Sequence, residues 1–461
     1  MAQKTCELKI SKNTRVIKKD KKALVYNAFF GNAMICHTDM TKLLDHICQK
    51  QSFHHLKTCW GQPDLETAIS ELIQKGFIVD NALVETNPPY ALFQNNEIQT
   101  GCLINKLRLN VSLACNMNCA YCYVDEKDLT QNDALMTWDT AKKAINEFFS
   151  LLGQHHHKFC IIRFFGGEPL LNWSVIKRSL NHIQATKKDI SVHFILNTNG
   201  TIYSKKMAAI LATNKVGIAI SLDGIKKEHN LFRPFKTGKP SYNRIARNIE
   251  NFLSAGCILG IETTIGNHNI LGLQNLIDQI ALWNITYKTC IPISLQHLAI
   301  VDKKDLDTIP VNEKIKHLTA LLEYARQKNV TADTGMAHFS INALKGQRNL
   351  GRYCRAMGGE LCVYPNGEIY PCAALNIKLG TINNLTAVFS SAAYQTLTNR
   401  TTGNIKGCKG CDIEAFCAGG CAADAFAANG NVNTPMTNCD LERKFFKSLV
   451  KNNILISANI S

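Results

Sequence analysis

Strand-like and helix-like segments alternate along the middle of this chain, and this alternation restricts the possible fold more than any other feature. Runs rich in β-branched and aromatic residues occur six times, with helix-period runs between them. The strand-like runs are residues 106–113, 160–165, 191–198, 216–222, 258–265 and 290–298, and the helical runs are residues 137–152, 173–183, 204–213, 242–255 and 273–283. Six βα units in succession predict an α/β protein whose parallel sheet curls into a partial (β/α)6 barrel of the TIM type.

A smaller unit precedes the barrel. Residues 15–38 contain three strand-like runs, separated by turn signals at Asp20 and Gly31, and two amphipathic helical runs follow at 41–50 and 64–77. Three strands followed by helices predict a winged-helix-like module. We expect it to occupy residues 1–88 and to be joined to the barrel by a linker around Pro88 and Pro89.

The C-terminal part has a different composition. Beyond Gly346 the helical and strand periodicity fades, and cysteines and glycines crowd together between Cys354 and Cys439. A region with so few core-forming runs needs another source of stability, which bound metal supplies in many small domains. We therefore expect a barrel at residues 101–310 and a separate metal-binding domain at residues 345–445.

The cysteine count indicates the compartment. Nineteen cysteines would favour disulfides in a secreted protein, but residues 1–15 contain no apolar segment of a signal peptide, and no later apolar run is long enough to span a membrane. We predict a cytoplasmic protein without membrane contact, whose reduced thiols are available to metal.

The formal charge of +16 would suit a nucleic-acid partner, but no basic-aromatic motif accompanies it. We therefore do not expect nucleic acid as a partner. Part of the excess is local, in the lysine cluster at 18–22. That cluster is either a solvated hairpin or a docking surface for an acidic peptide.

Three cysteines follow the first strand of the predicted barrel. They are Cys115, Cys119 and Cys122, in the stretch CNMNCAYC. Loops beyond the carboxyl ends of parallel strands are where such sheets place their chemistry. Three thiolates cannot complete an iron–sulfur cube, so one iron would stay open to another ligand.

This spacing resembles that of the radical S-adenosylmethionine superfamily, and further segments carry the same resemblance. FFGGEP at 164–169, NTNG at 197–200 and SLDG at 221–224 follow the second, third and fourth strands. The resemblance implies that the cofactor is held by these segments and by Tyr121 beside the last cysteine. The implied contacts are Gly166, Gly167, Glu168 and Pro169 for the methionine amino group, Asn199 and Ser221 for the ribose and carboxylate, and the backbone of Tyr121 for adenine.

The resemblance also implies the chemistry. S-adenosylmethionine would chelate the open iron of a [4Fe–4S] cluster, and its reductive cleavage would release a 5′-deoxyadenosyl radical that abstracts hydrogen from an unactivated carbon. The alternative is a zinc site or a chance trio of cysteines, which leaves the GGEP and SLDG segments unexplained.

The later cysteines resemble the SPASM extension found in radical enzymes that act on peptides. The seven positions are Cys354, Cys372, Cys408, Cys411, Cys417, Cys421 and Cys439. By resemblance they hold two auxiliary [4Fe–4S] clusters. Cys408, Cys411, Cys417 and Cys439 would bind the outer cluster, and Cys354, Cys372 and Cys421 the inner one. The inner set lacks a fourth ligand, which is either Cys362 or a position left open; a zinc ribbon is the wider alternative.

The N-terminal module resembles the element that binds leader segments of ribosomally made peptides by strand addition. We therefore predict an oxidoreductase, a maturase that modifies a precursor peptide or protein and forms a carbon–carbon cyclophane or a thioether crosslink. Its electron donor would be a flavodoxin or a ferredoxin.

Two alternatives have other functions. Anaerobic sulfatase maturases, which make formylglycine, carry an acidic residue after the cysteine of a YPC motif, where this chain has Ala373 and Ala374. Another base would then be needed; the candidates are Asp424 and Glu414, with Asp223 and His297 at strand ends. An iron–sulfur regulator that binds DNA is the alternative from a different class, and it predicts no turnover of S-adenosylmethionine.

Overall fold

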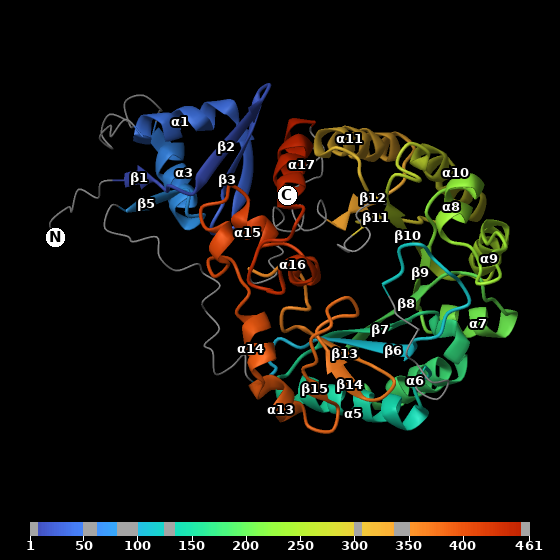
Figure 1. Ribbon diagram of the computed structural model, residues 1–461. Helices are drawn as coiled ribbons and strands as arrows, with labels where there is room; N and C mark the ends of the chain where they lie inside the picture. Colours follow the sequence, from blue (N-terminus) through green and yellow to red (C-terminus); the bar gives the residue numbers. More distant parts are fainter. Residues whose placement is uncertain are drawn as a thin grey trace.

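The computed structural model describes residues 8–48, 62–80, 100–123, 134–298, 307–335 and 351–452. The predicted linker around Pro88 lies outside these residues. Figure 1 shows a strongly curved sheet with helices along its outer side. The C-terminal region, orange to red, lies between this sheet and the N-terminal module, which is blue.

Six parallel strands form the centre of a ten-stranded sheet, so the predicted partial barrel is confirmed. They follow one another in chain order, as successive βα units require. The strands are β6 (Lys106–Ser112), β7 (Phe159–Gly166), β8 (Ser191–Thr198), β9 (Gly217–Ser221), β10 (Ile258–Ile265) and β11 (Ile293–His297).

The sheet continues beyond both edges of this six-stranded core. Strand β12 (Ala332–Thr334) pairs parallel with β11, and β13 (Glu360–Val363) pairs parallel with β6. Strands β14 (Glu368–Tyr370) and β15 (Gly380–Thr381) then add antiparallel. The first strands of the predicted C-terminal domain thus extend the barrel sheet, so the two regions share one sheet.

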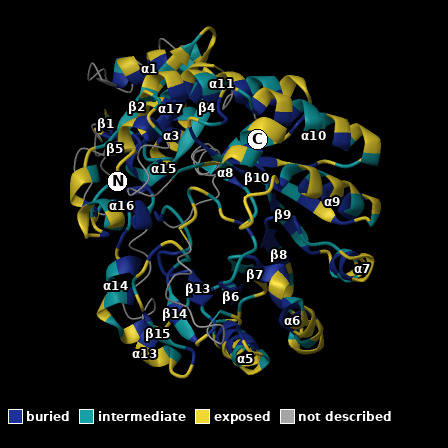
Figure 2. Cartoon of the chain, turned by 45° about the vertical axis from the view of Figure 1, so that its right-hand side comes forward, coloured by how far each residue is buried: buried dark blue, intermediate teal, exposed yellow. Residues whose placement is uncertain are grey.

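Helices cover the outer face of the sheet. They are α5 (Trp138–Gln154), α6 (Trp173–Thr186), α7 (Lys205–Thr213), α8 (Lys226–Phe232), α9 (Tyr242–Ser254), α10 (Leu273–Tyr287) and α11 (Val311–Gln327). Figure 2 shows buried residues on the sheet side of this layer and exposed ones outside. Within the described residues, no helix is both long and apolar enough to cross a membrane.

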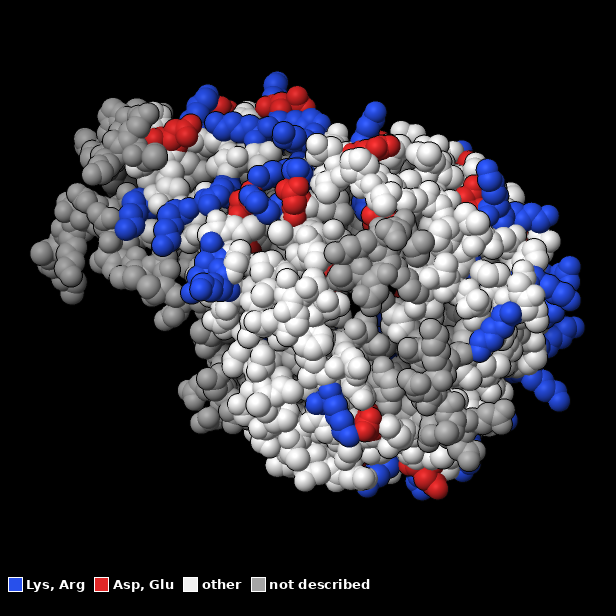
Figure 3. Space-filling model, viewed as in Figure 1, with Lys and Arg blue, Asp and Glu red and all other residues white. Residues whose placement is uncertain are grey.

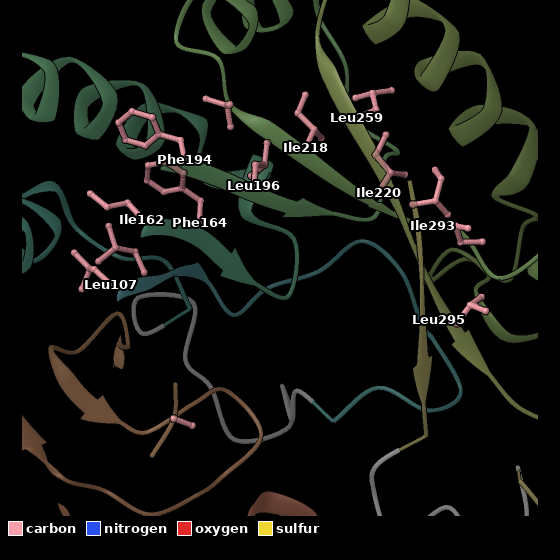
Figure 4. Packing of buried hydrophobic residues seen from close by; sticks show 14 of the residues in the cluster. Leu107, Ile162, Phe164, Phe194, Leu196, Ile218, Ile220, Leu259, Ile293 and Leu295 are labelled. Carbon is pink, nitrogen blue, oxygen red and sulfur yellow. The ribbon is translucent and has the colours of Figure 1, made fainter. Parts of the chain in front are cut away.

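The barrel core lies between the sheet and these helices. Alternate strand residues point outward into it, among them the buried Leu107, Phe164, Leu196, Ile220 and Leu295 (Figure 4). Burying each such side chain contributes about 1.5–3 kcal/mol. The intervening residues face the inside of the curve and are mostly polar, so the inner face is available for chemistry.

The N-terminal module has the predicted order of strands and helices. Strands β2 (Thr14–Lys19), β3 (Lys22–Asn27) and β4 (Ala33–His37) form an antiparallel sheet, and α1 (Thr38–Cys48) and α3 (Gln62–Gln74) follow. A second antiparallel pair, β1 (Leu8–Ile10) with β5 (Ile78–Asp80), was not predicted. The middle strand is β3, so β2 and β4 are the two edges of the three-stranded sheet.

Strand β3 joins the module to the C-terminal region because both of its faces are buried. Val25 packs with the helices of the module, in a cluster that includes Leu43. Tyr26 points the other way, and its ring lies edge-on to Phe416 at 5.5 Å and to Phe446 at 5.4 Å between centroids. The module is therefore docked on the C-terminal region through a buried aromatic cluster.

The C-terminal region contains more apolar core than its sequence led us to expect. Its helices are α13 (Leu385–Ser390), α14 (Ala392–Thr398), α15 (Glu414–Cys417), α16 (Ala422–Asn429) and α17 (Cys439–Lys451). Helix α17 buries Leu441, Phe445, Phe446 and Leu449. This helix packs against α11 of the barrel, so the region has an apolar core in addition to any metal.

Replacing Tyr26 by alanine should detach the N-terminal module. Removing a buried aromatic ring costs about 3–5 kcal/mol. We expect Tyr26→Ala to lower the midpoint of thermal unfolding and to make the module the first site of limited proteolysis. Val16→Ala is the matched control, because Val16 lies on the neighbouring strand and is exposed. Equal protease resistance of the two variants would contradict docking through Tyr26.

Candidate active site

The loop that carries the first three cysteines is fastened to the segment after α8. Met117 forms an isolated antiparallel bridge with Phe235. The backbone N–H of Ala120 donates to the carbonyl of Phe232, at 2.9 Å. The segment after the fourth barrel strand thus fixes a loop that follows the first strand.

The three cysteines lie close together on this loop. The Sγ of Cys115 accepts from the side-chain amide of Asn199 at 3.7 Å, and Arg233 approaches the Sγ of Cys119 at 4.0 Å. The Cys119 thiol interacts electrostatically with both Cys115 and Cys122. Burial raises the pKa of Cys115 to about 11, so this thiol ionises at neutral pH only beside a cation or a metal.

Two glycines bring the GGEP segment against the cysteine loop. A Cβ on Gly166 would stand 1.8 Å from the carbonyl oxygen of Ser112, and one on Gly167 would stand 2.6 Å from that of Ala114. The Gly166 φ of 139° also disfavours any side chain. The N–H groups of Gly167 and Glu168 donate to Ser112 and Ala114 at 2.7 and 2.9 Å. The two glycines are therefore required for this backbone contact.

Glu168 is fully buried at the centre of this contact. Its carboxylate accepts from the backbone N–H groups of Leu170 and Asn199, at 3.0 and 2.7 Å, and from the hydroxyl of Thr198 at 2.8 Å. Pro169 begins the short helix η2 (Pro169–Asn172) behind it. Burial raises the pKa of Glu168 to about 7, although these three donors oppose the increase.

The other predicted cofactor contacts lie at the same edge of the sheet. The Asn199 side chain donates to Asn116 of the cysteine loop at 2.8 Å, in addition to its contact with Cys115. Ser221 is the last residue of β9, opposite Glu262 of β10. Asn199 therefore stabilises the cysteine loop, and cofactor contacts by Asn199 and Ser221 stay predictions.

Asp223 is engaged in a buried network with Tyr121. The Tyr121 hydroxyl donates to Asp223, Arg233 Nε donates to the same carboxylate at 2.9 Å, and the backbone N–H of Thr264 donates at 3.0 Å. Burial raises the pKa of Asp223, but the Arg233 guanidinium, the nearby histidines and the Tyr121 hydroxyl together outweigh burial and hold the pKa well below its usual range. Asp223 and Arg233 pair with each other, so Asp223 is not a free base.

The later cysteines fall into two groups. Cys354 and Cys372 each interact electrostatically with Cys421. Cys417 interacts with the remaining ones, which are Cys408, Cys411 and Cys439. No disulfide joins these residues. The structure thus brings together the members of each predicted set, and their role as cluster ligands stays a prediction.

Among the described residues, no three His, Cys, Asp or Glu side chains are close enough to hold a single metal ion. A structural zinc site requires four ligands around one ion, whereas in an iron–sulfur cube each thiolate binds a different iron.

Cys362 is fully buried on β13. Its Sγ accepts from the side chain of Asn110 at 3.5 Å, and the residue lies opposite Tyr370. It also interacts electrostatically with Cys372 of the inner set. Cys362 thus remains a candidate for the fourth inner ligand.

Arg400, which the sequence analysis did not single out, has a structural role near the auxiliary cysteines. Its fully buried guanidinium donates to the carbonyls of Gly419, Gly420 and Thr434, at 2.7, 3.2 and 2.9 Å. These carbonyls flank the segment that carries Cys421. A single arginine among polar residues has no distinguishing pattern, so only the fold could reveal this role.

The two candidate bases near these cysteines are also structural. Glu414 accepts from the backbone N–H groups of Gly403 and Gly410, at 2.8 and 3.1 Å. Asp424 accepts from the backbone N–H and the hydroxyl of Thr437, at 2.7 and 2.8 Å. Both carboxylates hold loops in place.

Comparison with known proteins identifies two regions. Residues 109–279 match the Radical SAM superfamily, and residues 354–412 match SPASM, an iron–sulfur cluster-binding domain. Both matches confirm the resemblance predicted from the cysteine spacing. Among curated relatives, the radical SAM cyclopropyl synthase TigE of Paramaledivibacter caminithermalis is 24% identical and aligns over 96% of each chain.

Two solved structures show the same fold. Native anSMEcpe with bound AdoMet has a TM-score of 0.64 at 18% identity, and the match covers 77% of this chain and 100% of that one. Streptococcus suis SuiB bound to precursor peptide SuiA has a TM-score of 0.56 at 15% identity, over 94% of this chain and 99% of that one. The second match spans the N-terminal module as well as the barrel.

A methyl group at Gly166 should displace the cysteine loop. We expect Gly166→Ala to destabilise the protein by about 3 kcal/mol or more, because the new Cβ overlaps a backbone oxygen. Bound iron after anaerobic reconstitution should fall by one cluster. Gly153→Ala is the matched control: no atom lies within 4 Å of its added Cβ, so iron content should not change. Full iron loading of Gly166→Ala would contradict the required contact.

Glu168 should make stability depend on pH. Folding raises the pKa of Glu168 from 4.5 to about 7, so the folded state binds the proton more tightly than the unfolded state does. The free energy of unfolding should therefore fall as pH rises from about 4.5 to 7, by about 3 kcal/mol at most. We expect the midpoint of thermal unfolding, measured without S-adenosylmethionine, to fall less between pH 5.5 and 8 in Glu168→Gln than in the wild type. Equal pH dependence would show that Glu168 ionises normally.

Proposed function

We propose that this chain, which carries a radical S-adenosylmethionine domain followed by a SPASM domain, is a maturase that oxidatively modifies a ribosomally made precursor peptide. The observation that carries the proposal is the position of the N-terminal module. It is docked through Tyr26 on the region that holds the auxiliary cysteines, with two sheet edges that a peptide can extend. The structure of SuiB bound to precursor peptide SuiA supports a peptide substrate.

Each cofactor has a set of residues to hold it. A radical S-adenosylmethionine domain binds a [4Fe–4S] cluster together with S-adenosylmethionine, and a SPASM domain binds auxiliary iron–sulfur clusters. Cys115, Cys119 and Cys122 would hold the first cluster, and the two later groups would hold two auxiliary clusters. When bound, the reduced first cluster and S-adenosylmethionine supply a 5′-deoxyadenosyl radical, which is able to abstract hydrogen from an unactivated carbon.

The residues around the first cysteines would orient the cofactor. Buried Glu168 would offer its carboxylate to the cationic amino group of the cofactor, and the contact at Gly166 and Gly167 holds the Glu168 segment beside the cysteine loop. An ammonium partner would keep Glu168 ionised at neutral pH, because an opposite charge lowers the pKa of a buried carboxyl. The Tyr121–Asp223 network would fix the other side of the loop.

Substrate would bind between the first cysteines and the inner auxiliary set. Tyr123 interacts electrostatically with both Cys122 and Cys372, so the two sets share the inner face of the barrel. A peptide residue placed there would be near the radical source and near a cluster that can accept an electron. The product would be a carbon–carbon cyclophane or a thioether crosslink.

A leader segment would bind to the N-terminal module. Figure 3 shows Lys and Arg side chains gathered over the visible face of this module. Lys18, Lys21 and Lys22 are exposed on the hairpin between β2 and β3. An acidic leader would be attracted to this surface. A flavodoxin or a ferredoxin would supply the electrons.

Formylglycine formation is less consistent with the site. No carboxylate follows Cys372, where Ala373 and Ala374 stand, and the two alternative bases, Asp424 and Glu414, are occupied in loop contacts. A DNA-binding regulator would leave the buried Glu168 and its glycines without a role. Both alternatives give distinct outcomes in the test below.

Accurate mass of a precursor peptide encoded beside the gene tests the proposal. After anaerobic co-expression we expect the wild type to remove two hydrogens and Cys119→Ala to leave the peptide unchanged. A product that reacts with a carbonyl reagent would instead indicate formylglycine. No mass change with wild type, and no deuterium incorporation in a repeat in deuterated water, would argue against peptide modification.

A further inference from the structure

A row of side chains crosses the inner face of the barrel below the cysteine loop. The strand register places Cys362 of β13 beside Arg108 of β6, Arg108 beside Arg163 of β7, and Arg163 beside Ile195 of β8. Residues that are paired across neighbouring strands point to the same face. Two arginines therefore stand next to each other, an arrangement that is unfavourable unless anions compensate both charges.

Arg108 is fully compensated. Its Nε donates to Glu360 at 2.5 Å, and its guanidinium lies 4.9 Å from the centroid of the Phe165 ring. The other carboxylate oxygen of Glu360 binds Lys106 at 2.7 Å. Glu360 is thus shared between two cations and has no free oxygen directed at Arg163.

Arg163 interacts electrostatically with Glu262 and Glu360, but no hydrogen bond to a described residue satisfies its buried Nε. The other nearby carboxylate, Glu262, accepts from Asn197 at 2.7 Å and forms no hydrogen bond with Arg163. Leaving a buried guanidinium donor unsatisfied costs free energy that a bound acceptor would recover.

Two more unsatisfied atoms lie on the same face. The side-chain oxygens of Asn110 and Asn197 are buried without partners among the described residues. Asn110 is paired with Phe165, and Asn197 follows on the next strand, so both lie one row above Arg163. The face therefore offers one cationic donor and two acceptors, the pattern that suits a carboxylate attached to a chain of amide N–H groups.

Small residues form part of the inner face near Arg163. Beyond Ile195, which is paired with Arg163, the inner-face positions on the next strands include Gly217, Ala219 and Gly260. Glycine and alanine carry at most a methyl group, so no bulky side chain from these positions covers the face beside Arg163. The GGEP rim, where the cofactor would bind, begins three residues after Arg163, which is about 10 Å along a strand.

We propose that Arg163 binds a carboxylate of the peptide substrate and so selects a peptide with an acidic group close to the modified residue. This proposal rests on the proposed function. The carboxylate belongs to an Asp or Glu side chain or to the C-terminus of the peptide. The depth of Arg163 below the GGEP rim favours these sources over the carboxylate of S-adenosylmethionine.

Steady-state kinetics of the anaerobically reconstituted holoenzyme with the precursor peptide test the proposal. We expect Arg163→Met to raise the KM for the peptide at least tenfold while the KM for S-adenosylmethionine stays within twofold, and Arg163→Lys to recover part of the loss. Arg244→Met, on the exposed side of α9, is the matched control and should change neither KM. A tenfold rise in the KM for S-adenosylmethionine with Arg163→Met would overturn the proposal.

Peptide variants identify the carboxylate. Single Asp→Asn and Glu→Gln changes and a C-terminal amide are compared with both enzymes. One of these peptide variants should have a tenfold higher KM than the parent peptide with the wild-type enzyme. The same variant should have no higher KM than the parent peptide with Arg163→Met. If every amide variant has the parent KM, the proposal is wrong. If the proposed function itself is wrong, neither the wild type nor Arg244→Met will modify the peptide. That result differs from an unchanged KM.

A measurement without peptide separates the two failures further. Crystals of the holoenzyme grown in sodium bromide should show an anomalous bromide peak beside the Arg163 guanidinium in the wild type and none in Arg163→Met. Absence of the peak in the wild type overturns the anion site, whether or not the peptide is modified.

Discussion

The parallel pairing of β13 with β6 is the interaction on which the arrangement of the site depends. It joins residues about 250 positions apart in the chain, and Glu360 reinforces it by binding Lys106 and Arg108 across the two strands. Strand β6 leads directly into the first cysteine loop, and β13 leads toward Cys372. One strand pair therefore sets the distance between the site of radical chemistry and the inner auxiliary cysteines, because both loops leave the same pair.

The same pairing explains the position of the N-terminal module. The C-terminal region is held to the barrel by β13 and by the packing of α17 on α11, and the module is held to that region by Tyr26. A peptide bound to the module would be connected to the barrel through the cysteine-rich region, not through the linker alone. The C-terminal region thus has a structural role besides binding clusters, since it fixes the N-terminal sheet relative to the inner face of the barrel.

Much of the fold was predictable because local pattern and tertiary structure agree. The six barrel strands alternate apolar residues toward the helices with polar ones toward the inside, a pattern that is visible in sequence. Helix α8 was missed because seven residues give too little periodicity, and the core of α17 was missed because cysteines and glycines dominate its surroundings. The partners of Asp223 and Glu414 were not predictable, because a carboxylate looks the same in sequence whether it serves as a base or as a loop anchor.

Amino-acid order alone indicated an iron–sulfur site, since cysteines separated by three and then two residues can meet on one loop that follows a strand. The glycines at 166 and 167 were predicted as cofactor contacts, and the structure adds their backbone contact with Ser112 and Ala114, which only glycine permits. Tertiary structure decided which buried donors lack hydrogen-bond partners. Glu360 binds Arg108 and leaves the Arg163 Nε without a hydrogen-bond partner among the described residues only because three strands distant in the chain lie side by side. Charge compensation depends on neighbours in space, and spacing along the chain carries no information about them.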